Sequence, residues 1–128
     1  MALSVTPDRT LVASGQVGLE PMIFVWDTEN AERQNFMTLP KGSRSVSAIA
    51  WSSDARYIAA ADMSDDHNIH IFDTQTLDKK NKATKIATQK SDRNKIFMIE
   101  WKPDSHEFVS VGVKHYCHWT LNGTTLKY

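Results

Sequence analysis

The sequence predicts an all-β fold of about three four-stranded antiparallel β-propeller blades that form part of a larger propeller. Three observations predict it. One strand motif returns with a period of 46 to 47 residues, Pro-Asp or Ser-Asp turns recur at matching places, and the apolar runs are short and rich in β-branched and aromatic residues. Four short strands per repeat of this length are typical of propeller blades, whereas strands of a sandwich show no such long-range copying.

The repeat is visible in three strands of each copy. First strands with their turns read LSVTPD, IAWSSD and IEWKPD from Leu3, Ile49 and Ile99; second strands read LVASGQV, YIAAADM and FVSVGV from Leu11, Tyr57 and Phe108; third strands read MIFVWDTEN, NIHIFDTQT and HYCHWTLNG from Met22, Asn68 and His115. Fourth strands are expected near residues 34–39, 84–89 and 124–128, which gives blades of approximately 2–40, 45–90 and 95–128.

The turns between first and second strands have a chemical signature. Pro fixes φ for a turn, and an Asp side chain can accept a hydrogen bond from the backbone that follows it. Pro7-Asp8, Ser53-Asp54 and Pro103-Asp104 are therefore predicted hairpin turns.

Each third strand carries a large aromatic residue, namely Trp26, Phe72 or Trp119. A blade packs on neighbours through both faces, so we expect these side chains to fill the space between blades. Propellers close with typically four to eight blades, and three form only an arc. The exposed faces and edges of this arc predict self-association or a longer parent protein.

Composition and charge indicate an ordinary globular protein. The chain is 41% hydrophobic and 23% charged, and its formal net charge is zero, so no nucleic-acid or membrane partner is expected. No apolar run approaches the ~18 residues of a membrane span. Cys117 is the single cysteine, which rules out an intramolecular disulfide and favours a reducing compartment, here the cytoplasm.

The sequence predicts no enzyme, no cofactor and no catalytic or metal-binding residue. Cys117 and His118 point to opposite faces of a strand and cannot grip one ion. His118 aligns with Val25 and Ile71, which predicts a packing position. The histidines His67 and His70, beside Asp65 and Asp66, are interpreted as a solvated turn. Phosphate loops and nucleophile elbows are missing from the sequence.

Basic residues concentrate between residues 79 and 95. Seven occur there: Lys79, Lys80, Lys82, Lys85, Lys90, Arg93 and Lys95. The first four are assigned to a connection from third to fourth strand and the last three to the connection into the next blade, at the other end of the sheet. The latter three and Arg44, all in loops that enter first strands, are the candidate partner-binding residues. Rigid propellers bind partners through such loops.

Two segments resemble the echinoderm microtubule-associated protein-like (EMAP-like) family of WD-repeat propellers. They are LSVTPDRTLVASGQVGLEPMIFVWDTE, Leu3 to Glu29, and VSVGVKHYCHWTLNG, Val109 to Gly123. The resemblance implies a non-catalytic cytoskeletal scaffold in the cytoplasm whose parent protein binds tubulin or microtubules. Two alternatives stay open: a generic WD-repeat scaffold of another complex, and the propeller part of a multidomain enzyme.

The WD-repeat pattern is imperfect here. Such repeats usually carry Gly-His before the first strand and an Asp six residues before the Trp, joined in a hydrogen-bonded network. Asp66, Glu20 and Val113 occupy the Asp position in this chain, and no Gly-His occurs. We therefore expect a partial network, with Ser14 as a partner of Trp26, and stability mainly from apolar packing between blades.

Overall fold

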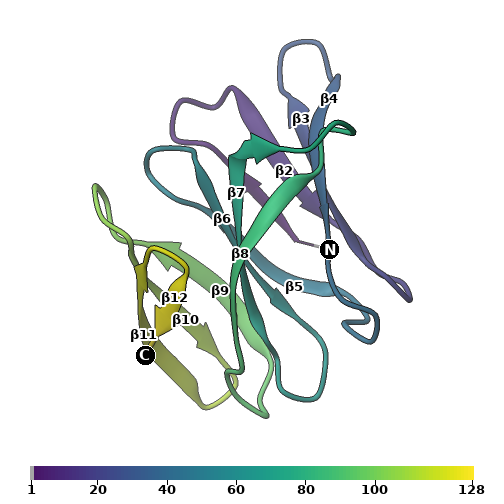
Figure 1. Ribbon diagram of the computed structural model, residues 1–128. Helices are drawn as coiled ribbons and strands as arrows, with labels where there is room; N and C mark the ends of the chain where they lie inside the picture. The colour runs from purple at the N-terminus through teal and green to yellow at the C-terminus, as the bar shows by residue number, and fades with distance from the viewer. Residues whose placement is uncertain (1) are drawn as a thin grey trace.

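The computed structural model describes residues 2–128, which form three four-stranded antiparallel sheets in sequence order. In Figure 1 the sheets follow one another from the purple N-terminal sheet through the teal and green second sheet to the yellow third sheet at the lower left. The predicted all-β propeller fold is confirmed. Residues 2–128 contain no helix long and apolar enough to cross a membrane.

Each sheet uses consecutive strands, so every connection within a sheet is a hairpin. The first sheet holds β1 (Leu3–Val5), β2 (Leu11–Gly15), β3 (Met22–Asp27) and β4 (Arg33–Thr38). The second holds β5 (Val46–Trp51), β6 (Tyr57–Asp62), β7 (Ile69–Leu77) and β8 (Ala83–Gln89). The third holds β9 (Ile96–Trp101), β10 (Glu107–Gly112), β11 (His115–Asn122) and β12 (Thr125–Lys127).

Asp closes two of the three predicted turns between first and second strands. The carboxylates of Asp8 and Asp54 accept hydrogen bonds from the backbone N–H two residues on, at 3.0 and 3.2 Å. In the third turn Ser105 Oγ accepts from the Glu107 N–H at 3.1 Å instead, and the backbone of Asp104 adopts a left-handed φ of 57°. The hairpin turn predicted at Pro103-Asp104 is thus present, but the side chain that accepts the backbone hydrogen bond is that of Ser105 and not that of Asp104.

The core consists of two apolar layers between adjacent sheets. Ile58 and Phe72 of the second sheet face the first sheet, whereas Ala59 and Ile71 face the third. Successive residues of a strand point to opposite faces, so a strand with both faces covered must be apolar at nearly every position. This explains the continuous apolar run of β6 and the Ile69, Ile71 and Phe72 side chains of β7. The aromatic residue of β11, Trp119, is fully buried in the second layer.

The outer faces of the first and third sheets have no neighbouring sheet within residues 2–128. Trp26 lies on the open face of the first sheet and is only partly buried. His118 lies on the open face of the third sheet, with 51% of its side chain exposed. The prediction that His118 packs like Val25 and Ile71 is thus wrong, because no sheet covers this face. Self-association through the open faces stays a prediction.

Two glycines allow strands and connections to approach closely. A Cβ at Gly112 would lie 2.0 Å from the carbonyl oxygen of Lys95, and a Cβ at Gly15 would lie 2.6 Å from the Cβ of Val46. Real Cβ atoms do not approach backbone or packed side chains so closely. Gly112 therefore lets the connection between the second and third sheets lie directly on the end of β10.

Candidate functional site

The structure gathers the four candidate partner-binding residues at one end of the sheets. Arg44 lies in the connection from β4 to β5, and Lys90, Arg93 and Lys95 lie in the connection from β8 to β9. In consecutive antiparallel hairpins these connections share an end with the β2–β3, β6–β7 and β10–β11 loops. We call this the basic end. Its loops carry six basic residues, Lys41, Arg44, Lys90, Arg93, Lys95 and Lys114, and four acidic ones, Glu20, Asp65, Asp66 and Asp92.

Three further lysines lie in a hairpin at the opposite end. Lys79, Lys80 and Lys82 lie in the β7–β8 hairpin, as expected. Lys85 lies within β8, opposite Phe72, so its predicted place in the connection is wrong. The strand begins at Ala83, one residue before the start of the strand expected at 84–89, and that expected strand already included Lys85.

Two of the four candidates are neutralised by acidic neighbours. Arg44 Nη1 lies 3.3 Å from Asp65 Oδ1, and Lys90 Nζ lies 3.5 Å from Asp66 Oδ2. These pairs are solvent-exposed and contribute only about 0–1 kcal/mol each to stability. Arg93 and Lys95 form no ion pair with any carboxylate among residues 2–128. Of the four candidates, they are therefore the two that remain free to pair with a partner's carboxylates.

Backbone hydrogen bonds between loops hold the basic end together. The Gly18 N–H donates to the Arg44 carbonyl at 2.8 Å, and the Met63 N–H donates to the Ser43 carbonyl at 3.0 Å. The Val113 N–H donates to the Lys95 carbonyl at 2.9 Å. The Ser91 N–H donates to the Asp66 carbonyl at 3.2 Å and joins these two groups of loops. Loops from all three sheets are thereby connected, so the charged side chains project from a defined scaffold.

A buried polar network anchors the β6–β7 loop. His70 is fully buried, and its Nε2 lies 2.8 Å from Asp62 Oδ2 while its Nδ1 lies 3.0 Å from the Thr88 hydroxyl. Asp62 also accepts hydrogen bonds from Ser64 Oγ at 2.6 Å and from the Asn68 N–H at 3.0 Å. Burial alone would raise the pKa of Asp62, but the hydrogen bonds from His70 and Ser64 outweigh it and lower that pKa.

The interpretation of this region as a solvated turn is therefore wrong. His67 is 8% exposed and His70 is fully buried. Asp66, which the WD-repeat spacing selects, is an exposed partner of Lys90, and Asp62 provides the buried carboxylate instead. The sequence signal was available in retrospect: Asp62 ends an almost wholly apolar strand, where a carboxylate requires a buried partner.

A second network runs through the third sheet. Trp119 Nε1 donates to Ser110 Oγ at 2.9 Å, Ser110 Oγ lies 2.8 Å from His115 Nε2, and His115 Nδ1 lies 2.9 Å from Asp92 Oδ2. A neutral imidazole can accept from the serine hydroxyl and donate to the carboxylate, so all four groups are satisfied. The hydrogen bond from His115 is the main cause that lowers the pKa of Asp92.

This network ties the connection that carries Arg93 and Lys95 to the core. In the usual WD-repeat pattern the histidine precedes the first strand and the aspartate precedes the Trp. Here the aspartate, Asp92, lies in the connection before the first strand, and the histidine, His115, precedes Trp119 in β11. A search for Gly-His and for an Asp before the Trp therefore misses it. The first sheet holds a shorter version, in which Trp26 Nε1 donates to Ser14 Oγ at 3.0 Å, and this predicted pair is confirmed.

We expect Ser110→Ala to lower the free energy of unfolding by about 1–3 kcal/mol, because it leaves Trp119 Nε1 and His115 Nε2 unpaired. Ser14→Ala is the matched control and should cost less, since Trp26 is partly exposed and water can replace the hydroxyl. Urea unfolding of both variants measures the difference. Equal losses of unfolding free energy would show that His115 and Asp92 add nothing to the stability that the Trp–Ser hydrogen bond provides.

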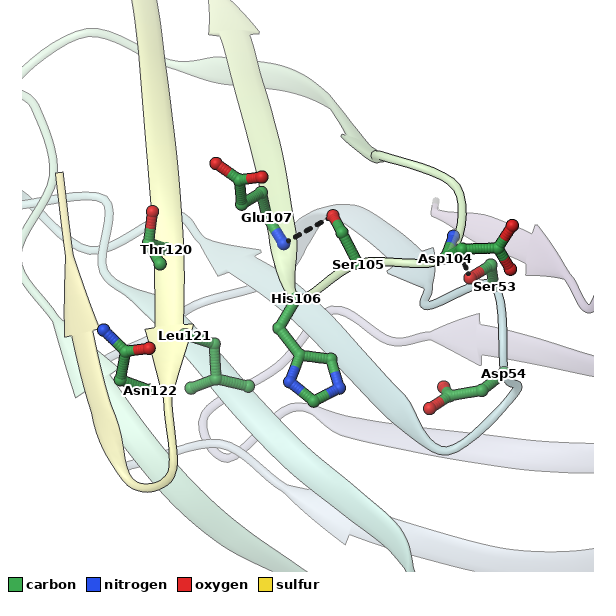
Figure 2. Close-up of a pocket in the computed structure, with 9 residues that line it drawn as sticks. All are labelled: Ser53, Asp54, Asp104, Ser105, His106, Glu107, Thr120, Leu121 and Asn122. Atoms are coloured by element: carbon green, nitrogen blue, oxygen red, sulfur yellow. Dashed lines mark hydrogen bonds between the residues drawn. The ribbon is translucent and has the colours of Figure 1, made fainter.

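A hollow of about 610 Å³ lies at the opposite end, between the β5–β6 and β9–β10 turns. Figure 2 shows the His106 ring projecting into it between Leu121 and Asp54. The two turns are joined by the Asp104 N–H, which donates to Ser53 Oγ at 2.9 Å. His106 hydrogen-bonds neither serine that lines the hollow, so the geometry provides no activated nucleophile.

Other reactive groups are also poorly placed for chemistry. Burial, and to a lesser degree the charge of Asp92, raises the pKa of the Cys117 thiol, so the thiol stays protonated. Cys117 faces the second sheet and His118 the open side, which confirms that the two point apart. Among residues 2–128 no group of three or more His, Cys, Asp or Glu is arranged to hold a metal ion.

Comparisons with known proteins agree with this architecture. The WD domain, G-beta repeat family (WD40) matches residues 34–73. The chain is 33% identical to the ciliary WD repeat-containing protein ctxp80 of Euplotoides octocarinatus, over 98% of this chain and 17% of that protein. It is 30% identical to echinoderm microtubule-associated protein-like 1 of Homo sapiens, over 97% of this chain and 16% of that protein. The chain thus spans about one sixth of these relatives' length.

Solved structures match the fold at lower identity. The β-propeller domain of Cps50 (Swd1) from Myceliophteria thermophila superposes with a TM-score of 0.74 at 14% identity, covering 98% of this chain and 35% of that one. Hsv2p of Kluyveromyces lactis gives 0.71 at 20% identity, covering 94% and 41%. The chain is a WD-repeat β-propeller segment that is homologous over nearly its whole length to the echinoderm microtubule-associated protein-like proteins.

Proposed function

We propose that this chain is a non-catalytic protein-interaction segment of a cytoplasmic, microtubule-associated WD-repeat protein, and that its basic end contacts tubulin. The observation that supports the contact is the placement of Arg44, Lys90, Arg93 and Lys95 on loops cross-connected by backbone hydrogen bonds. An acidic surface such as that of tubulin is complementary to this end. Charge complementarity chiefly raises the rate of encounter and is screened by salt.

The supporting homology is to proteins named for microtubule association, and it covers nearly the whole chain. The similarity to WD-repeat proteins supports a scaffold rather than an enzyme. Within the basic end, Arg93 and Lys95 are the residues on which the proposal depends most, because Arg44 and Lys90 already have acidic partners.

Reversing all four charges to Glu should weaken microtubule co-sedimentation of the full-length protein that contains this chain by about tenfold or more at low salt. The reason is that four attractive contacts become repulsive. The matched control is Glu at Lys79, Lys80, Lys82 and Lys85, which changes the net charge equally at the opposite end. Equal weakening by both variants, or by neither, would contradict the proposed contact.

A further inference from the structure

The basic end also contains a hollow at which exposed apolar side chains meet polar ones. It has a volume of about 230 Å³ and is lined by Val17, Val46, Met63 and Phe97 together with the polar residues Ser45, Ser47 and Lys95. Val17 is 76% exposed and Phe97 is 56% exposed. Such apolar exposure, concentrated at one place and rimmed by charge, marks an interaction site more often than chance.

The walls are held in place by the fold. Val17 forms an isolated antiparallel bridge with Ser45, and the Val46 N–H donates to the Gln16 carbonyl at 3.2 Å. Phe97 lies in β9, and the Lys95 ammonium lies 6.0 Å from its ring centroid. The hollow is therefore largely pre-formed, so a partner does not have to order it on binding.

The size of the hollow limits what it can hold. Typical small-molecule sites measure roughly 300–1,000 Å³, so this one is too small for a drug-sized ligand and suits one large side chain. A second hollow of about 380 Å³ shares Met63 with it and is lined by Arg44 and Arg93 and by the acidic residues Asp65 and Asp66, which pair with Arg44 and Lys90. The cations without an ion pair are therefore Lys95, which lines the first hollow, and Arg93, which lines the adjoining one.

We propose that the basic end binds an acidic peptide segment that inserts one large apolar side chain between Val17 and Phe97. Acidic residues flanking this anchor lie against Lys95 and Arg93. The inference rests on the proposed function in placing the contact at this end, and it adds an apolar specificity element to the charge attraction. A purely acidic segment would leave the Val17 and Phe97 side chains exposed and bind less tightly.

The test uses two fluorescent poly-glutamate peptides of equal length, one with a central phenylalanine and one with a central alanine. Fluorescence anisotropy with this chain should show the phenylalanine peptide binding about tenfold more tightly, a difference of about 1.4 kcal/mol. The double variant Val17→Ser, Phe97→Ser should abolish that preference and leave the alanine peptide's affinity unchanged. Circular dichroism melting checks that the variant is folded.

The control is Leu77→Ser combined with Tyr116→Ser, two exposed apolar residues away from the hollow. It should keep the tenfold preference. Equal affinity for both peptides, or a preference that survives in the Val17, Phe97 variant, would overturn the inference. The proposed function is tested separately. If microtubule binding survives reversal of the four charges, the tubulin contact is contradicted, whereas the peptide preference is unaffected.

Discussion

Trp119→Ala should lower the free energy of unfolding by about 3–5 kcal/mol, enough to unfold a large fraction of a marginally stable domain. The indole is fully buried, its ring centroid lies 6.0 Å from that of Phe108 in a stacked arrangement, and its Nε1 donates to Ser110. Truncation thus opens a cavity in the second apolar layer and leaves the serine–histidine pair without its donor. Urea unfolding followed by circular dichroism measures the loss.

Trp26→Ala is the matched control, because Trp26 occupies the equivalent place in the first sheet and also donates to a serine. Its ring lies on the open face and is partly exposed, so less apolar area returns to water when the chain unfolds. We expect a loss well below that of Trp119→Ala. Similar losses would contradict the assignment of Trp119 to the buried layer between two sheets and of Trp26 to an uncovered sheet face.

The sequence was sufficient for the fold because the repeat fixes it several times over. Each copy has the same strand order, turn residues and aromatic position. An ambiguous strand in one copy can therefore be assigned from the equivalent strands in the other two. The exceptions are local. In the third turn the side chain of Ser105, and not that of Asp104, accepts the backbone hydrogen bond. Lys85 lies in β8 (Ala83–Gln89), as the fourth strand expected at 84–89 required, so its assignment to the preceding connection was inconsistent with that strand.

The polar networks were harder to predict, because they depend on which segments meet in space. Asp92 and His115 lie 23 residues apart and on different sides of β9 and β10, and spacing along the chain does not pair them. His118 was misplaced for a related reason: alignment gives the face of a strand and says nothing of what covers that face. The candidate cations were placed correctly at one end, but their acidic partners emerged only in three dimensions.

Asp62→Ala should lower the free energy of unfolding by about 3–5 kcal/mol, as for other buried pairs that lose one member. The change leaves His70 Nε2 and the Asn68 N–H without an acceptor in a region that excludes water. Asp66→Ala, four residues on, is the control: this carboxylate is exposed, and its loss should change stability by less than about 0.5 kcal/mol. Urea unfolding near neutral pH compares the two.

The pH dependence provides an independent check on Asp62. Its pKa is lower in the folded chain than its ordinary value of 3.8, so the folded state binds fewer protons than the unfolded state in acid. The contribution of Asp62 is therefore fully present above about pH 5 and is lost as the pH falls through the folded pKa. The Asp62→Ala variant should lose less stability than the parent chain between about pH 5 and pH 2. If the free energies of unfolding of the two proteins fell in parallel with pH, the pKa of Asp62 would not be lowered by folding.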